Sequence, residues 1–297
     1  MKISTIKRGL HELCLLLKAN KINAHYLGIP ALKNRVNIYE YHPELIGYDL
    51  FQSEPYNLGD SLGRVIVEFL LEKKNIKVDK NISKTKHLNV VGSNIFCSYQ
   101  DTTIWGSGIM YPPTKFESFF QKLSKRKLDI RAVRGPLTSK ILEEFGYFCP
   151  TIYGDPAILM PFVYNPNIEK TKKYLIIPQF AVEREFRNKY SSDNVISMNT
   201  NDYKIVIDKI KSCECVYTSS LHGIILAESY GVPAVFFRGL GHNIDFKYLD
   251  YYYSTGRYDI KIAESFEEAL LTPPPTLPNL SKMQQDLLDT FPYDLWE

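Results

Sequence analysis

Hydrophobic and polar positions along the chain alternate between two patterns. Short apolar runs predict buried strands, and longer stretches with apolar residues three and four apart predict amphipathic helices. In residues 61–74, for example, Leu62, Val65, Ile66 and Phe69 recur at helical spacing. Strand-like and helix-like stretches follow one another in turn, which is the pattern of a doubly wound parallel sheet.

The alternation continues through both halves of the chain. The predicted strands are residues 35–41, 88–91, 103–105, 130–133, 174–177, 215–218 and 234–237. The predicted helices are residues 61–74, 135–145, 202–212, a helix that opens at His222 and ends at Gly231, and 281–288. We therefore expect an α/β fold with two domains that face each other across a cleft.

Length and composition agree with this organisation. A chain of 297 residues suits two domains of roughly 150 residues each. The expected boundaries are 1–160 for the first domain, 161–270 for the second, and 271–297 for a proline-rich connector and a terminal helix that can pack back on the first domain. Hydrophobic residues make up 44% and charged residues 23%, the balance of an ordinary soluble globular protein.

Charge and cysteine content exclude several classes of protein. A net charge of +3 is too small to argue for nucleic-acid binding, although it allows a local cationic pocket. The five cysteines are scattered without a CxxC pair or a zinc-like cluster, so neither a disulfide framework nor a metal site is supported. This cysteine usage suits the cytoplasm.

The N-terminal segment is basic. Residues 5–18 predict a helix whose apolar run is too short for a signal sequence or a membrane span. Such a helix can touch anionic lipid, or it can pack on the first domain. The first reading would place the protein at the inner face of the membrane.

Two glycine-containing loops follow predicted structure in the first half. In the first, Asn57, Gly59 and Asp60 open a helix; Asp60 or Ser61 can cap it, and Gly59 lets a ligand approach the backbone. A helix cap and a substrate contact are equally good interpretations of this loop. The second loop, at residues 106–108, is Gly106, Ser107 and Gly108; glycines after a strand often admit a ligand, but this pair lacks the full phosphate-binding fingerprint.

A third loop carries arginines. Arg134 stands at a corner between a strand and a helix that has Pro136 near its start, where a guanidinium can bind a carboxylate or a phosphate. A surface ion pair is the alternative. Arg131 alternates with Arg134 along the strand and can point away from the same site.

The fourth loop joins the strand 215–218 to the helix that contains His222. Ser219 and Ser220 are expected to cap this helix, and its first turn offers free N–H groups beside an imidazole. An anion cradle next to a titratable group predicts chemistry, with His222 catalytic. A structural histidine in the first turn of a buried helix is the alternative.

Together these segments resemble the polysaccharide pyruvyltransferase family. The resemblance spans about residues 56–237. It rests on five motifs: Asn57-x-Gly59-Asp60, Gly106-Ser107-Gly108, Arg131-x-x-Arg134-Gly135, Gly154-Asp155-Pro156, and Ser220-Leu221-His222-Gly223 followed by Glu228 and Gly231-Val232-Pro233.

The resemblance implies a fold and a reaction. It implies two Rossmann-like domains, similar to GT-B glycosyltransferases, and transfer of a pyruvyl group from phosphoenolpyruvate to two hydroxyls of a sugar in capsule, exopolysaccharide or cell-wall polymers. The product is a pyruvate ketal, and the acceptor can be lipid-linked. His222 would be the catalytic histidine. Some members carry an arginine where this chain has Ser220, and Arg238 is our candidate for the missing cation.

The residues also fit the chemistry. Arg134 and the amides from Ser220 and Leu221 to His222 can bind the donor anion, and His222 can transfer protons near neutral pH. The first two loops and Asp155 are expected to contact the acceptor or line the cleft. No metal or cofactor is required. A nucleotide-sugar glycosyltransferase of the same shape and a non-catalytic assembly partner are the alternatives.

Overall fold

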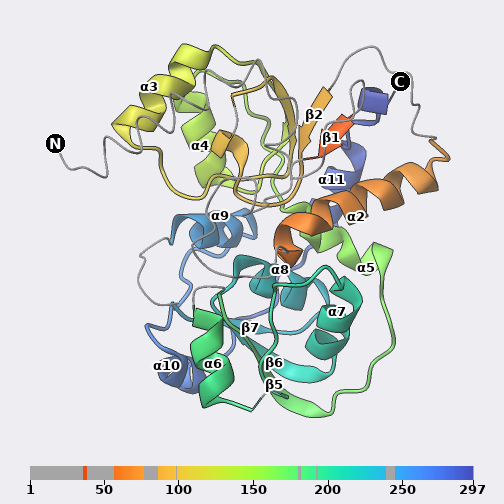
Figure 1. The fold of residues 1–297 in the computed structure, drawn as a ribbon, viewed down its shortest axis with the longest axis vertical. Helices are drawn as coiled ribbons and strands as arrows, with labels where there is room; N and C mark the ends of the chain where they lie inside the picture. The colour runs from red at the N-terminus through yellow and green to blue at the C-terminus, as the bar shows by residue number, and fades with distance from the viewer. Residues whose placement is uncertain are drawn as a thin grey trace.

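The described strands form two parallel sheets. A computed structural model describes residues 36–38, 57–76, 86–97, 99–179, 182–191, 193–238 and 245–296. One sheet has four strands in the order β1-β2-β3-β4, and the other has three in the order β5-β6-β7. Neighbouring strands run parallel throughout. The first sheet occupies the upper half of Figure 1 and the second the lower half, which confirms the α/β class.

The elements have the following bounds. The strands are β1 Val36–Ile38, β2 Lys86–Asn89, β3 Thr102–Trp105, β4 Leu128–Ala132, β5 Lys172–Ile177, β6 Cys213–Thr218 and β7 Ala234–Phe236. The α-helices are α2 Leu58–Lys73, α3 Lys115–Ser124, α4 Pro136–Glu144, α5 Met160–Val163, α6 Glu183–Lys189, α7 Tyr203–Lys211, α8 Leu221–Ser229, α9 Phe246–Ser254, α10 Phe266–Leu271 and α11 Ser281–Asp289. Three short 3₁₀ turns are η3 Ile95–Cys97, η4 Pro156–Leu159 and η6 Tyr293–Trp296.

Most predicted elements are present, with shifted ends. The predicted start of α2 at Ser61 is wrong, because the helix begins at Leu58 and has Asn57 as its N-cap. The sequence prediction does not contain the helices α3, α5, α6, α9 and α10. The predicted helix at residues 5–18, and most of the strand at 35–41, lie outside the described residues.

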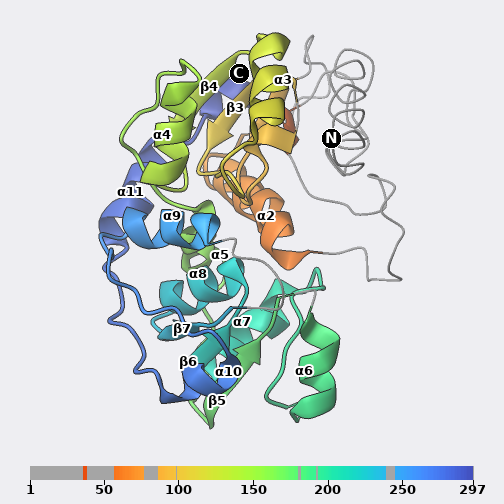
Figure 2. The same cartoon turned by 90° about the vertical axis from the view of Figure 1, so that its left-hand side faces the viewer.

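The sheets form because their strands are buried runs with helices against them. Every residue of β3 is buried, as are the last three of β5. Parallel strands with both faces covered are expected to be continuously apolar rather than alternating. Figures 1 and 2 show α2 and α4 beside the first sheet and α7 and α8 beside the second.

One hydrophobic core runs through both sheets. It contains Leu62 and Ile66 of α2, Leu175 of β5 and Ile224 of α8, none of which is exposed to solvent. The two sheets are therefore joined by apolar packing. The domain boundaries expected from the sequence stay a prediction.

The C-terminal segment returns to the first sheet (Figure 2). The indole Nε1 of Trp105 in β3 donates a hydrogen bond to the carbonyl of Leu287 in α11, at 3.0 Å. The ring of Phe291 packs edge-on against Trp105, with centroids 4.9 Å apart. These contacts attach the last helix to the sheet on which the chain begins.

The polar loops lie where parallel α/β sheets place their sites. Residues 106–108 follow β3, Arg134 follows β4, and residues 219–222 follow β6, so each loop stands at the carboxyl end of a strand. The 3₁₀ turn η4, which Asp155 precedes, packs against both α2 and α8. These contacts bring loops of the two halves together.

Candidate active site

His222 lies in the first turn of α8 at the end of β6. Ser220 is the N-cap of this helix, and its backbone N–H donates to Oγ1 of Thr218 at 2.9 Å. Thr218 Oγ1 in turn donates to the carbonyl of Ile177 at 2.7 Å, which fixes the junction to β5. The imidazole is 9% exposed. A rigid hydrogen-bonded corner therefore holds a nearly buried histidine.

Gly59 makes room for the imidazole. A Cβ at this position of α2 would lie 1.8 Å from Nδ1 of His222, far inside van der Waals contact. The first turns of α2 and α8 therefore meet at the ring. Since the N-terminus of a helix carries a partial positive charge and unpaired N–H groups, two such ends face one place. The absence of a side chain at Gly59 therefore allows α2 and the imidazole of His222 to come together, whereas the sequence suggests that it allows a ligand to reach the backbone.

Asp155 faces the other side of the ring. Its Oδ2 lies 3.7 Å from Nε2 of His222, and its Oδ1 accepts a hydrogen bond from the backbone N–H of Ala157 at 3.0 Å. Among the described residues, neither Asp155 Oδ2 nor His222 Nε2 has a hydrogen-bond partner, and both atoms are buried. Nε2 of the ring therefore faces Asp155, and Nδ1 lies on the Gly59 side.

The helix caps differ from the prediction. Neither α2 nor α8 has a side-chain hydrogen bond from its N-cap residue. The amide of Asn57 donates to the carboxylate of Asp60 at 2.8 Å, and Ser219 Oγ accepts from the backbone N–H of Gln179 at 2.7 Å. Ser220 therefore takes the predicted N-cap position of α8, although its side chain makes no cap hydrogen bond, whereas the prediction that Asp60 or Ser61 caps α2 is wrong because Asn57 is its N-cap. Both helix ends keep first-turn amides that their caps do not satisfy.

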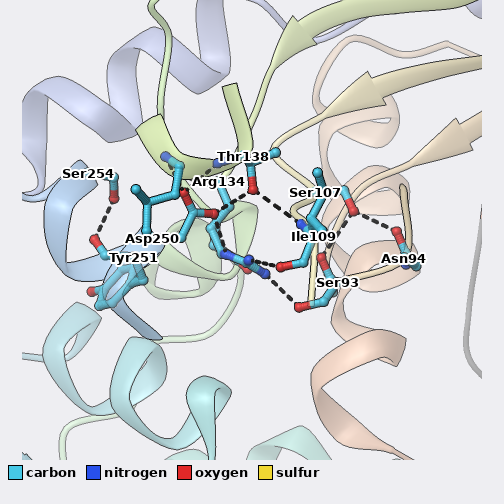
Figure 3. Close-up of polar contacts among 12 residues, drawn as sticks. Ser93, Asn94, Ser107, Ile109, Arg134, Thr138, Asp250, Tyr251 and Ser254 are labelled. Atoms are coloured by element: carbon cyan, nitrogen blue, oxygen red, sulfur yellow. Dashed lines mark hydrogen bonds and ion pairs between the residues drawn. The ribbon is translucent and has the colours of Figure 1, made fainter. Parts of the chain in front are cut away.

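Arg134 is fully buried and bound by the protein itself (Figure 3). Its Nε donates to Oδ2 of Asp250 at 3.1 Å, Nη1 donates to Oγ of Ser93 at 2.7 Å, and Nη2 donates to the carbonyl of Ile109 at 2.6 Å. The anion that this guanidinium binds in the structure is therefore a carboxylate of the chain, from a helix that the sequence analysis missed.

Asp250 also occupies the N-terminus of α4. Its Oδ1 accepts from the backbone N–H groups of Leu137 and Thr138, at 2.9 and 3.0 Å, and its Oδ2 accepts from Thr138 Oγ1 at 2.6 Å. The expected anion cradle beside Arg134 is thus present, but Asp250 fills it. At the start of α2, the backbone N–H of Leu58 donates to the carbonyl of Met198 at 2.8 Å, so part of this helix end is also satisfied by the chain.

The glycine loops pack against the charged residues. A Cβ at Gly108 would lie 2.3 Å from the guanidinium carbon of Arg134, and one at Gly106 would lie 2.3 Å from Pro156. Ser107 is fully buried and donates to the carbonyl of Gly92 at 3.0 Å. This loop therefore offers no side chain to an acceptor in the present conformation.

The carboxylate of Asp60 also packs against a glycine. Its Oδ1 would lie 2.3 Å from a Cβ on Gly92, where φ is +103°. Gly92 therefore needs both the space and the backbone freedom of glycine. Asp155, which was also expected to line the cleft, is likewise fully buried.

Arg238 follows β7 and is bound by carboxylates. Its guanidinium contacts Asp245 through two nitrogens and Glu264 through a third. Side-chain hydrogen bonds to these two groups raise the pKa of Arg238. The structure therefore pairs our candidate cation with two negative charges.

The helix α9 supplies the cation that the sequence analysis missed. Burial lowers the pKa of Lys247 to about 8; the nearby charge of Arg134 lowers it further, and that of Asp60 opposes the shift. The next residue, Tyr248, donates from its hydroxyl to the carbonyl of Ser219 at 2.7 Å, which attaches α9 to the His222 junction. Lys247 is therefore near enough to Arg134 and Asp60 for both charges to act on it. No sequence motif pointed to it.

The described residues lack two kinds of feature. They contain no group of three or more histidine, cysteine or acidic side chains arranged to hold a metal ion. No helix in this part of the chain is long and apolar enough to cross a membrane.

The comparison with protein families decides the identity. The family model described as "Polysaccharide pyruvyl transferase" matches residues 57–242, which include the α2 start, the Arg134 loop and the His222 junction. The chain belongs to the polysaccharide pyruvyl transferase family. Members of this family are enzymes, so the protein is a transferase.

Two further proteins are similar to this chain. An uncharacterized protein of Acanthamoeba polyphaga mimivirus is 30% identical over 207 residues, which are 66% of this chain and 69% of that protein. The crystal structure of a functionally uncharacterized protein from Klebsiella pneumoniae aligns with 89% of this chain and 100% of its own, at 14% identity and a TM-score of 0.45.

The contact between Gly59 and His222 yields a prediction about activity. In Gly59→Ala the new Cβ must displace the imidazole, and a displacement of about 1 Å can cost roughly 10²-fold in rate. We expect pyruvyl transfer to fall by about that factor. Gly63→Ala, one turn further along α2, is the matched control, because its Cβ meets Val90 at 3.2 Å and not the site. Steady-state rates of both variants test this. Equal rates for Gly59→Ala and the wild type contradict it.

The pair of Arg134 and Asp250 yields a prediction about stability. Asp250→Asn leaves a buried guanidinium without its carboxylate, which we expect to cost roughly 3–5 kcal/mol of unfolding free energy. Asp294→Asn is the control, because Asp294 pairs with Arg131 at the surface and should contribute at most about 1 kcal/mol. Urea unfolding of the two variants measures the difference. A similar loss of unfolding free energy in the two variants would show that the Arg134–Asp250 pair stabilises the fold no more than the Arg131–Asp294 pair does.

Proposed function

We propose that the protein transfers the pyruvyl group of phosphoenolpyruvate to two hydroxyls of one sugar, in a polysaccharide or its lipid-linked precursor. The products are a pyruvate ketal and phosphate. The observation that carries this proposal is the position of His222, where the uncapped first turns of α2 and α8 meet beside Asp155. Membership of the family supports a pyruvyl donor and a saccharide acceptor.

The donor anion needs positive charge, and three groups supply it. The first-turn amides of α2 and of α8, from Leu221 to His222, attract a phosphate or carboxylate, and the ammonium of Lys247 is close to the same region. In this proposal Lys247 replaces Arg238 as the second cation, because Arg238 is bound to two carboxylates. Arg134, predicted to touch the donor, instead positions the site through Asp250 and α9.

His222 carries the proton transfers. A proton added to the methylene carbon of phosphoenolpyruvate makes C2 electrophilic, and a sugar hydroxyl adds to C2 and loses its own proton. Phosphate then leaves with the proton of the first hydroxyl, as hydrogen phosphate, and the second hydroxyl closes the ketal and returns its proton to the imidazole. An imidazole that donates a proton to carbon, passes the first hydroxyl proton to the phosphate and recovers the second serves these steps in turn. Asp155 would orient the ring from the Nε2 side, leaving Nδ1 for the substrate.

The arrangement of the two halves is part of the proposal. We propose two Rossmann-like domains in a GT-B-like arrangement, with the boundary near residue 160 and the segment 271–297 returning to the first domain. The two parallel sheets and the contacts of Trp105 with Leu287 and Phe291 support this division. The cytoplasm, at the inner face of the membrane, is the location that suits a lipid-linked acceptor.

Incubation with phosphoenolpyruvate and candidate saccharides tests the function. We expect phosphate release that depends on the acceptor, together with a mass gain equal to one pyruvate ketal. Release of a nucleotide from a sugar nucleotide, without phosphate release from phosphoenolpyruvate, would instead indicate a glycosyltransferase. That result would refute the proposal.

Replacement of His222 tests its role. His222→Gln and His222→Ala should lower turnover by about 10²–10⁴-fold, the usual contribution of a general acid–base group. Folding should survive, since the apolar residues of α8 and the corner at Thr218 remain. Phosphate release and thermal unfolding separate the two effects. A folded variant with near-normal turnover would assign the proton transfer to another residue.

The lowered pKa of Lys247 predicts a pH dependence. The ammonium binds the donor when it is charged, which holds below its pKa of about 8, so affinity should fall as pH rises through that value. We expect phosphoenolpyruvate to bind about tenfold more weakly at pH 9 than at pH 7. Lys247→Arg is the matched control, since a guanidinium stays charged over this range and should remove the dependence. Calorimetric titration measures both. The same pH dependence in the arginine variant contradicts the assignment.

A further inference from the structure

The helix α3 exposes an apolar face. Phe116, Phe119 and Leu123 are 38%, 59% and 51% exposed, whereas Phe120 beside them is buried. Residues three and seven positions apart on a helix lie on one side of it. Three large apolar side chains therefore form a stripe directed to solvent, on the outer end of the first sheet in Figure 2.

Exposed lysines lie in α3 and directly after it. Lys115, Lys122, Lys125 and Lys127 are exposed, and Glu117 is the only acidic residue between positions 115 and 127. Glu117 accepts hydrogen bonds from the backbone N–H and the hydroxyl of Thr114 in a capping box, so it belongs to the start of the helix.

This combination selects one kind of partner. Protein interfaces are depleted in lysine, whereas helices that lie on anionic membranes combine an apolar face with a basic rim. Each lysine near an anionic bilayer strengthens binding roughly fivefold. The charge of the rim therefore favours a lipid surface over a protein.

The stripe is continuous in sequence with the site. Ile109, whose carbonyl accepts from Arg134, is followed at once by Met110 and Tyr111, which are 41% and 37% exposed. Four residues later α3 begins. A short exposed segment therefore joins Ile109 to α3.

We propose that α3 docks this protein on an anionic bilayer, with Phe119 and Leu123 inserted at the level of the headgroups and the lysines in contact with acidic lipid. The inference rests on the proposed function in one respect, because a bilayer is where a lipid-linked acceptor would be found. Its test measures binding without catalysis, so the two proposals can fail separately.

Flotation with vesicles tests the docking. The full chain should float with vesicles of phosphatidylglycerol and phosphatidylcholine in equal parts. It should bind at least tenfold more weakly to phosphatidylcholine alone, because the lysines then meet no acidic lipid. The double variant Phe119→Ser with Leu123→Ser, and the double variant Lys122→Glu with Lys125→Glu, should each weaken binding to the mixed vesicles at least tenfold.

A matched control keeps the result specific. Leu271 is 86% exposed and far along the chain in α10, so Leu271→Ser removes a similar apolar group and should bind as the wild type does. Circular dichroism and thermal unfolding confirm that each variant is folded. The proposal fails if the wild type does not float, or if both α3 variants float as strongly as the wild type. It also fails if Lys7→Glu with Arg8→Glu abolishes flotation while the α3 variants still bind.

Discussion

The close approach of α2 to α8 is the constraint on which the site depends. Two helices from different sheets can present their first turns to one imidazole only because residue 59 has no side chain. The partial positive charges of the two helix ends then add at His222, and the carboxylate of Asp155 faces the imidazole from the opposite side. An electropositive corner that holds an imidazole follows directly from this packing.

The same principle recurs in the neighbouring loops. Gly92 faces Asp60, Gly108 faces the guanidinium of Arg134, and a Cβ on Gly135 would lie 2.0 Å from the carbonyl oxygen of Asp250. Each of these glycines gives space to a charged residue, which buried charges need if they are to reach their partners. These glycines therefore make room for the buried polar network.

The helix α9 connects the two halves. Asp250 binds Arg134 and the start of α4, Tyr248 binds the carbonyl of Ser219, and the hydroxyl of Tyr251 donates to Glu228 of α8 at 2.8 Å. Lys247 lies on the same helix. One helix therefore sets the distance between the Arg134 network and the His222 junction, and a movement of α9 would change both together.

The sequence predicts the α/β class and most strands because hydrophobic periodicity is local. It also locates the polar loops, since helix starts, glycines and strand ends carry local signals. It does not predict α9, because its run of tyrosines is as typical of a strand as of a helix. Nor does it reveal that Asp250 binds Arg134, 116 positions away, because no spacing rule connects distant residues. The pairing of Arg238 with Asp245 and Glu264, and the position of Lys247, depend on tertiary packing in the same way.

A crystal structure of the protein with phosphoenolpyruvate tests the central claim most directly. The account predicts that the donor lies where α2 and α8 meet, with its anionic groups on the first-turn amides and Lys247 and its methylene carbon beside Nδ1 of His222. A donor bound at Arg238, or anywhere out of reach of His222, would contradict it.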